Sequence, residues 1–107
     1  MNNIKRILAV DDEPSMLRLL EISLKQADYQ PIMASDGIEA LSILRKGGVD
    51  LIVSDLHMPG MDGLRMLKKM NEEGLQIPII FVTAKGEVNS AVEAMKLGAS
   101  DYIQRPS

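Results

Sequence analysis

The sequence predicts an α/β fold in which helices cover both faces of a parallel sheet. Short apolar segments alternate four times with segments whose apolar residues recur at helical spacing. Residues typical of turns, mainly Gly, Pro and Asp, separate these segments. Strands that alternate with helices are joined by right-handed crossovers, which makes neighbouring strands parallel. At 107 residues the chain has the size of one domain.

The first three elements follow from short patterns. Residues 4–10 are apolar and predict a buried strand. Pro14 suits the first turn of a helix, and apolar residues at helical spacing follow it: Leu17, Leu20, Leu24 and Ala27. Residues 29–35 predict a second strand, and Pro31 indicates that this strand lies at an edge of the sheet.

The middle of the chain repeats this order. A second helix is predicted by Ile38, Leu41 and Leu44, and glycines at 47 and 48 end it. Residues 49–55 predict the third strand. Asp62 is the expected N-cap of a third helix, whose apolar residues are Leu64, Leu67 and Met70 and which ends at Gly74.

The last third supplies two more strands. Residues 77–84 are continuously apolar and predict a fourth strand that is buried on both faces. The spacing of Val88, Val92 and Met95 predicts a fourth helix that stops at Gly98. Residues 101–104 predict a short fifth strand.

Composition narrows the class of protein. Apolar residues make up 46% of the chain and charged residues 25%, as in globular domains. The formal net charge is −3 without a basic stripe, so we expect no direct binding of nucleic acid. Cysteine is absent, which excludes disulfides and thiolate metal sites, and the longest apolar stretch is too short to span a membrane. We therefore expect a cytoplasmic domain without membrane attachment.

Three carboxylates follow predicted strands at one edge of the sheet. Asp11 and Asp12 follow the first strand, and Asp55 ends the third. If these strands are neighbours, the carboxylates converge where ligands bind in such folds. Like charges that close raise one another's pKa unless a cation lies among them. A site made only of oxygen ligands favours a hard ion, and Mg²⁺ suits one with few protein ligands.

Two further side chains at this edge suit phosphoryl chemistry. Thr83 ends the fourth strand and Arg105 follows the fifth, and a hydroxyl and a guanidinium both bind phosphoryl oxygens. Three carboxylates, one Mg²⁺ and Arg105 sum to zero charge. The chain has no P-loop lysine motif, so the phosphoryl group is expected to come from an external donor.

Four motifs together resemble the receiver domain of a two-component response regulator. They are "VDDEP", "DLHMPGMDG", "FVTA" and "DYIQRP", in this order and spacing. The likeness covers essentially the whole chain and implies a flavodoxin-like sheet in the order 2-1-3-4-5. It also implies that Asp55 accepts a phosphoryl group from a sensor histidine kinase. Asp12, Asp55 and the backbone carbonyl of His57 would hold Mg²⁺, and Asp11 would bind it directly or through water.

The resemblance also implies a conformational switch. Thr83 and Tyr102 match a pair in which the hydroxyl moves to the phosphoryl oxygen and the aromatic ring follows it inward. Such a domain catalyses its own phosphorylation and dephosphorylation but turns over no separate metabolite. Its expected partners are the kinase and an output domain or effector protein. His57 and Lys85 occupy the positions that usually set the dephosphorylation rate.

The chain departs from the family at two points. Arg105 stands where the family has lysine, and a planar fork does not replace a compact ammonium conservatively. The family also continues with a fifth helix after the fifth strand. We therefore expect residues 1–107 to be a receiver domain cut after that strand. A partner, or a second copy in a homodimer, would then cover the exposed sheet face.

Other interpretations of these residues stay open. Asp12 or Glu13 could simply cap the first helix, and the imidazole of His57 could be an idle loop side chain. The domain could be a pseudo-receiver that docks without being phosphorylated. A phosphatase of the haloacid dehalogenase type would need an Asp two residues after Asp55, where His57 stands. Flavin binding is disfavoured because the acidic first loop would repel the cofactor phosphate.

Overall fold

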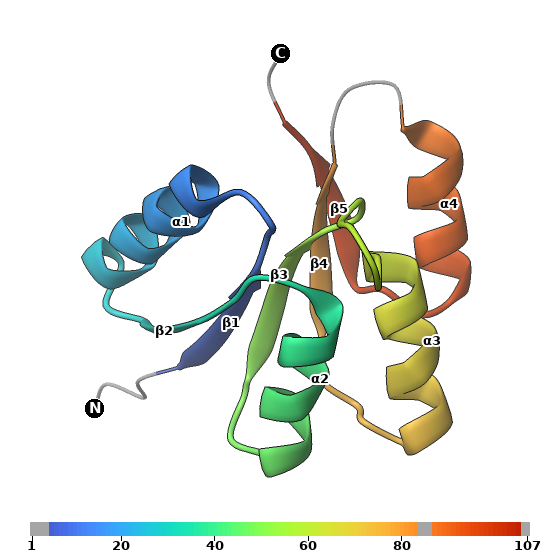
Figure 1. The fold of residues 1–107 in the computed structure, drawn as a ribbon, viewed down its shortest axis with the longest axis horizontal. Helices are drawn as coiled ribbons and strands as arrows, with labels where there is room; N and C mark the ends of the chain where they lie inside the picture. Colours follow the sequence, from blue (N-terminus) through green and yellow to red (C-terminus); the bar gives the residue numbers. More distant parts are fainter. Residues whose placement is uncertain (1–4, 84–86, 106–107) are drawn as a thin grey trace.

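A five-stranded parallel sheet forms the centre of the computed structural model, which describes residues 5–83 and 87–105 (Figure 1). The strand order is β2-β1-β3-β4-β5, which confirms the predicted flavodoxin-like fold. The strands are β1 (Arg6–Val10), β2 (Gln30–Ala34), β3 (Leu51–Asp55), β4 (Ile79–Thr83) and β5 (Asp101–Gln104). The edge position predicted for the second strand is therefore correct.

The helices lie unequally on the two sides of this sheet. α1 is alone on one side, and the other three helices lie on the opposite side (Figure 1). Their bounds are α1 (Pro14–Gln26), α2 (Gly37–Lys46), α3 (Gly63–Glu73) and α4 (Val88–Lys96). α1 packs on β1 and β2, whereas α2, α3 and α4 contact one another in sequence. None of these helices is long and apolar enough to cross a membrane.

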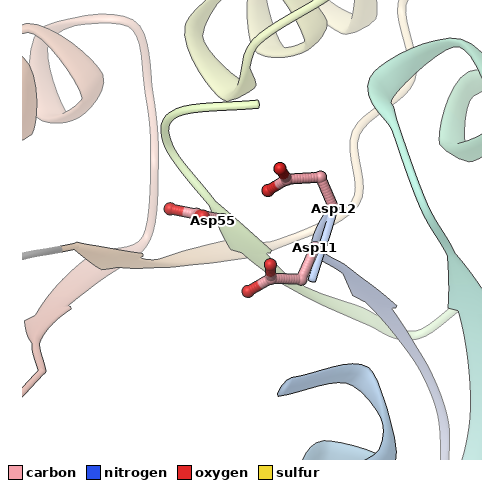
Figure 2. Close-up of side chains that lie close together, drawn as sticks. All are labelled: Asp11, Asp12 and Asp55. Atoms are coloured by element: carbon pink, nitrogen blue, oxygen red, sulfur yellow. The ribbon is translucent and has the colours of Figure 1, made fainter. Parts of the chain in front are cut away.

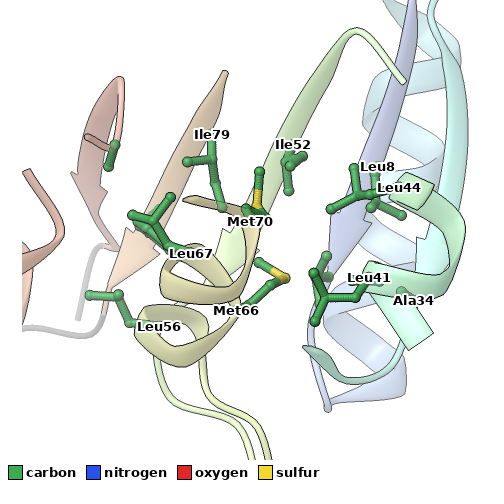
Figure 3. Close-up of a cluster of buried hydrophobic side chains, with 14 of the residues drawn as sticks. Leu8, Ala34, Leu41, Leu44, Ile52, Leu56, Met66, Leu67, Met70 and Ile79 are labelled. Carbon is green, nitrogen blue, oxygen red and sulfur yellow. The ribbon is translucent and has the colours of Figure 1, made fainter. Parts of the chain in front are cut away.

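The buried core lies between the sheet and the three-helix side. Figure 3 shows strand residues such as Leu8 and Ile52 facing Leu41 of α2 and Met66 of α3. Each of these four side chains is at most 2% exposed. α1 contributes no buried residue, so the apolar face of this helix is only partly covered by the sheet.

Helix ends follow the predicted signals at several points. Asp62 caps α3 by accepting a hydrogen bond from the Arg65 amide at 2.9 Å. Gly74 ends this helix with a left-handed conformation, φ +70°. Pro14 is the first residue of α1, but Glu13 before it makes no side-chain cap. A capping carboxylate from Asp12 or Glu13 is therefore not what begins this helix.

One prediction about burial is wrong. β4 is not fully buried on both faces: Phe81 is fully buried, but Ile80 and Val82 on the side of α1 are only partly buried. The fourth helix lies where its spacing predicted, but the apolar residues that predicted it do not face the core, since Val88 is 59% exposed and Met95 40%. The core-facing residues of α4 are the small Ala91 and Ala94.

Candidate functional site

The three predicted carboxylates meet at the carboxyl edge of the sheet. Asp11 and Asp12 directly follow β1, and Asp55 ends the neighbouring strand β3 (Figure 2). One oxygen of each carboxylate lies within 4.8 Å of an oxygen of the other two. The adjacency of β1 and β3 produces this convergence, because Val10 and Ser54 stand opposite each other in the parallel register.

Two hydrogen bonds hold Asp55 in place. Its Oδ1 accepts a hydrogen bond from the His57 amide at 3.3 Å, and the Ser54 hydroxyl donates to its backbone carbonyl at 2.8 Å. The loop after Asp55 folds back so closely that a Cβ on Gly63 would lie 2.7 Å from that carbonyl and 2.7 Å from Phe81 Cε1. Close packing against the end of β3, and not an unusual backbone conformation, is therefore what favours glycine at this position.

Burial makes Asp55 and Asp11 costly to ionise. Burial raises the pKa of Asp55 above its usual range, and the neighbouring charge of Asp11 adds to this effect. The His57 amide and the guanidinium of Arg105 oppose it. The pKa of Asp11 is raised as well, again mainly by burial, although the Glu13 amide donates to its Oδ1 at 2.9 Å.

The donor set fits a divalent cation. Three carboxylate oxygens converge, and one cationic side chain, Arg105, offsets part of their charge. A bound cation would favour the ionised forms of Asp11 and Asp55, whose pKa values are raised mainly by burial. Oxygen ligands alone favour a hard ion such as Mg²⁺ over softer metals.

The structure brings Arg105 and Thr83 to the same edge. Nη2 of Arg105 lies 3.9 Å from Oδ2 of Asp55, and its backbone amide donates to the Thr83 carbonyl at 2.7 Å. Thr83 is 2% exposed and lines a cavity of about 60 Å³ together with Tyr102. Tyr102 itself is 38% exposed, so it is not a core residue in this arrangement.

The side chain of His57 faces Glu87, which was not among the predicted site residues. Its Nε2 lies 3.1 Å from Oε2 of Glu87, just before α4. No spacing rule links positions 57 and 87, because the pair joins two different loops. Lys85, the second position expected to set the dephosphorylation rate, falls outside the described residues.

Comparison with known proteins decides the family. The family model described as "Response regulator receiver domain" matches residues 7–107. This chain is a receiver domain of a response regulator. Receiver domains are signalling modules of two-component systems and not conventional enzymes.

One relative of this receiver domain is a transcriptional regulator. The domain is 42% identical over 102 residues to the alkaline phosphatase synthesis transcriptional regulatory protein PhoP of Bacillus subtilis. The match covers 95% of this chain but 42% of PhoP, so the chain spans less than half of that relative.

Solved receiver structures agree in fold. Chemotaxis protein CheY4 of Vibrio cholerae superposes with a TM-score of 0.89 at 30% identity, covering 98% of this chain and 89% of that one. TrrA of Thermotoga maritima, in complex with Mg²⁺-BeF, gives a TM-score of 0.85 at 33% identity and covers 96% and 88%.

Proposed function

We propose that this receiver domain is a Mg²⁺-dependent phosphoacceptor switch and that Asp55 receives the phosphoryl group. The convergence of Asp11, Asp12 and Asp55 beside Arg105 is the observation that carries the proposal. A carboxylate oxygen of Asp55 attacks the phosphorus of a phosphohistidine on a sensor kinase. The phosphorus–nitrogen bond breaks, and the leaving group is the imidazole of the kinase histidine, which stays part of the kinase and is protonated from solvent.

Asp11, Asp12 and Asp55, with the backbone carbonyl of His57, would hold Mg²⁺. The ion supplies charge neutralisation for the phosphoryl oxygens when it is bound. Arg105 lies close enough to Asp55 to contact a phosphoryl group on that carboxylate. Its forked guanidinium can donate to two oxygens at once, which a lysine ammonium cannot do with fixed geometry.

The switch would act through Thr83 and Tyr102. The Thr83 hydroxyl moves to a phosphoryl oxygen, and the Tyr102 ring then enters the space that it leaves. The cavity shared by these two residues, together with the partial exposure of Tyr102, supports this role. Phosphorylation would thereby shift the population between two arrangements of this edge.

The wider assignment rests on the family and on the open face of the sheet. Response regulators work with histidine kinases and often carry an output domain or act on an effector protein. We propose that residues 1–107 form the receiver part of a longer cytoplasmic regulator. A fifth helix, a partner or a second copy of the chain would cover the face where Ile103 is exposed and Val82 is only partly buried. Nucleic acid would be contacted by other parts of that regulator.

Intact-mass measurement tests the proposal. The protein is incubated with Mg²⁺ and a small-molecule phosphodonor, and Asp55→Asn serves as the control. A gain of one phosphoryl group that requires both Mg²⁺ and Asp55 is the expected result. No gain by a protein that still binds Mg²⁺ would contradict the proposal and favour a pseudo-receiver that only docks.

A further inference from the structure

Glu87 precedes α4, but its carboxylate does not cap that helix. Its backbone carbonyl accepts the Ala91 amide at 3.1 Å, as an N-cap residue does. The side chain makes no capping hydrogen bond. The carboxylate instead reaches another loop, where its Oε2 lies 3.1 Å from Nε2 of His57.

The buried position of this oxygen makes the contact with His57 significant. Oε2 of Glu87 is shielded from solvent, and it accepts no well-aligned hydrogen bond from the residues within 5–83 and 87–105. A buried carboxylate oxygen without a polar neighbour is costly. The imidazole of His57 offsets that cost, although the ring itself remains half exposed.

The pair spans the two loops beside the phosphoacceptor. His57 follows Asp55 by two residues, and Glu87 follows Thr83 by four. β3 and β4 are neighbours, with Asp55 opposite Val82, so both loops leave the same edge of the sheet. Glu87 also lines the small cavity beside Thr83. The His57–Glu87 pair therefore bridges the side of the Asp55 site that faces β4.

We propose that Glu87 is a positioning residue. By holding the His57 side chain between the loops that follow β3 and β4, it lengthens the lifetime of phosphorylated Asp55. The inference rests on the proposed phosphoacceptor function. In hydrolysis, a water oxygen attacks phosphorus and the bond between phosphorus and the Asp55 oxygen breaks. The carboxylate and inorganic phosphate are released, and the proton of the water passes to phosphate or solvent. A ring held between the loops restricts the approach of that water.

The test compares decay rates of the phosphorylated protein after the phosphodonor is removed. We expect Glu87→Ala to raise the first-order decay constant roughly threefold to tenfold. Glu87→Gln should stay close to wild type, because its amide oxygen can still accept a hydrogen bond from the imidazole. Glu93→Ala removes a carboxylate from an exposed position of the same helix and should leave the decay constant unchanged.

A double-mutant cycle separates the bridge from a general structural effect. In a His57→Ala background, Glu87→Ala should change the decay constant little further, because the partner is already gone. The Mg²⁺ dissociation constant should stay at the wild-type value in Glu87→Ala. If Glu87→Ala fails to fold, the decay constant of phosphorylated His57→Ala tests the proposal instead. A His57→Ala protein that decays at the wild-type rate would overturn it.

Two other outcomes also reject it. One is an unchanged decay constant in folded Glu87→Ala, and the other is an equal acceleration with and without His57. Both require wild-type protein that carries a phosphoryl group on Asp55, so they leave the proposed function intact. Wild-type protein that never gains the group would instead overturn the function and this inference together.

Discussion

The two faces of the sheet are covered to different extents, most clearly at β4 and β5. On the side of α2, α3 and α4, Leu8, Ile52 and Phe81 are fully buried. On the side of α1, Val82 is only partly buried and Ile103 is 54% exposed. A groove of about 380 Å³ lies beside α1, and its lining residues are Lys5, Ile7, Leu24, Tyr29, Asp50, Leu51 and Val53.

This difference indicates which side supports the site. Gly63 and Phe81 both lie on the packed side. Gly63 lies so close to the Asp55 carbonyl and to the Phe81 ring that an added Cβ would clash with both. Close packing there holds the end of β3 in position. The open side contributes apolar surface that another segment or partner can cover, so changes there should affect association more than the site.

Neighbouring residues of β4 provide the largest expected contrast. Phe81→Ala should lower the free energy of unfolding by about 3–5 kcal/mol, because it leaves a cavity in the packed core. Val82→Ala, one residue away on the open side, should cost about 1 kcal/mol. Urea denaturation monitored by circular dichroism measures both values. Equal losses would mean that the open face is covered in solution.

Gly63→Ala tests how tightly the packed side closes around Asp55. The added Cβ would meet the Asp55 carbonyl and Phe81 at 2.7 Å, so we expect a loss of about 1–3 kcal/mol. Ser42→Ala, at an exposed position of α2, is the control and should stay within about 0.5 kcal/mol of wild type. A Gly63→Ala protein as stable as the control would show that the loop can move away at little cost.

Asp55→Asn should stabilise the protein at neutral pH when divalent ions are removed by a chelator. Asp55 and Asp11 have pKa values raised above 3.8, so the folded state binds more protons than the unfolded state just above pH 3.8. Stability therefore falls as pH rises through the raised pKa, and the full cost remains at pH 7. The Asn variant avoids part of this cost, which should raise its melting temperature by a few degrees.

Thermal unfolding at several pH values measures this effect with and without Mg²⁺. Adding Mg²⁺ should raise the melting temperature of the wild type more than that of Asp55→Asn, because the ion binds the ionised cluster. If the Asn variant melts below the wild type in chelator at pH 7, burial of the ionised carboxylates does not lower the stability of the folded protein.

Ile103→Ser is expected to have the smallest effect on folding. The side chain is 54% exposed on the open face, so the free energy of unfolding should change by less than about 0.5 kcal/mol. Self-association, measured by analytical ultracentrifugation, should weaken if this face pairs two copies. A destabilised Ile103→Ser monomer would contradict the description of the face as open.

Local patterns predicted the elements well and their faces less well. The N-cap at Asp62 and the edge strand containing Pro31 are where the sequence indicates, because capping and the missing amide of proline act within a few residues. Helical spacing also located α4 correctly. It did not identify the buried face of that helix, since Ala91 faces the core and Val88 faces solvent.

The sequence by itself determined which chemical groups the edge of the sheet would carry. Asp11 and Asp12 follow one predicted strand and Asp55 ends another in a pattern that requires parallel pairing, and they converge because β1 and β3 are neighbours in the sheet. Tertiary structure alone decided the partner of His57 and the unequal burial of β4. Both depend on contacts between segments far apart in the chain, and such contacts leave no periodic signal in the residues around either partner.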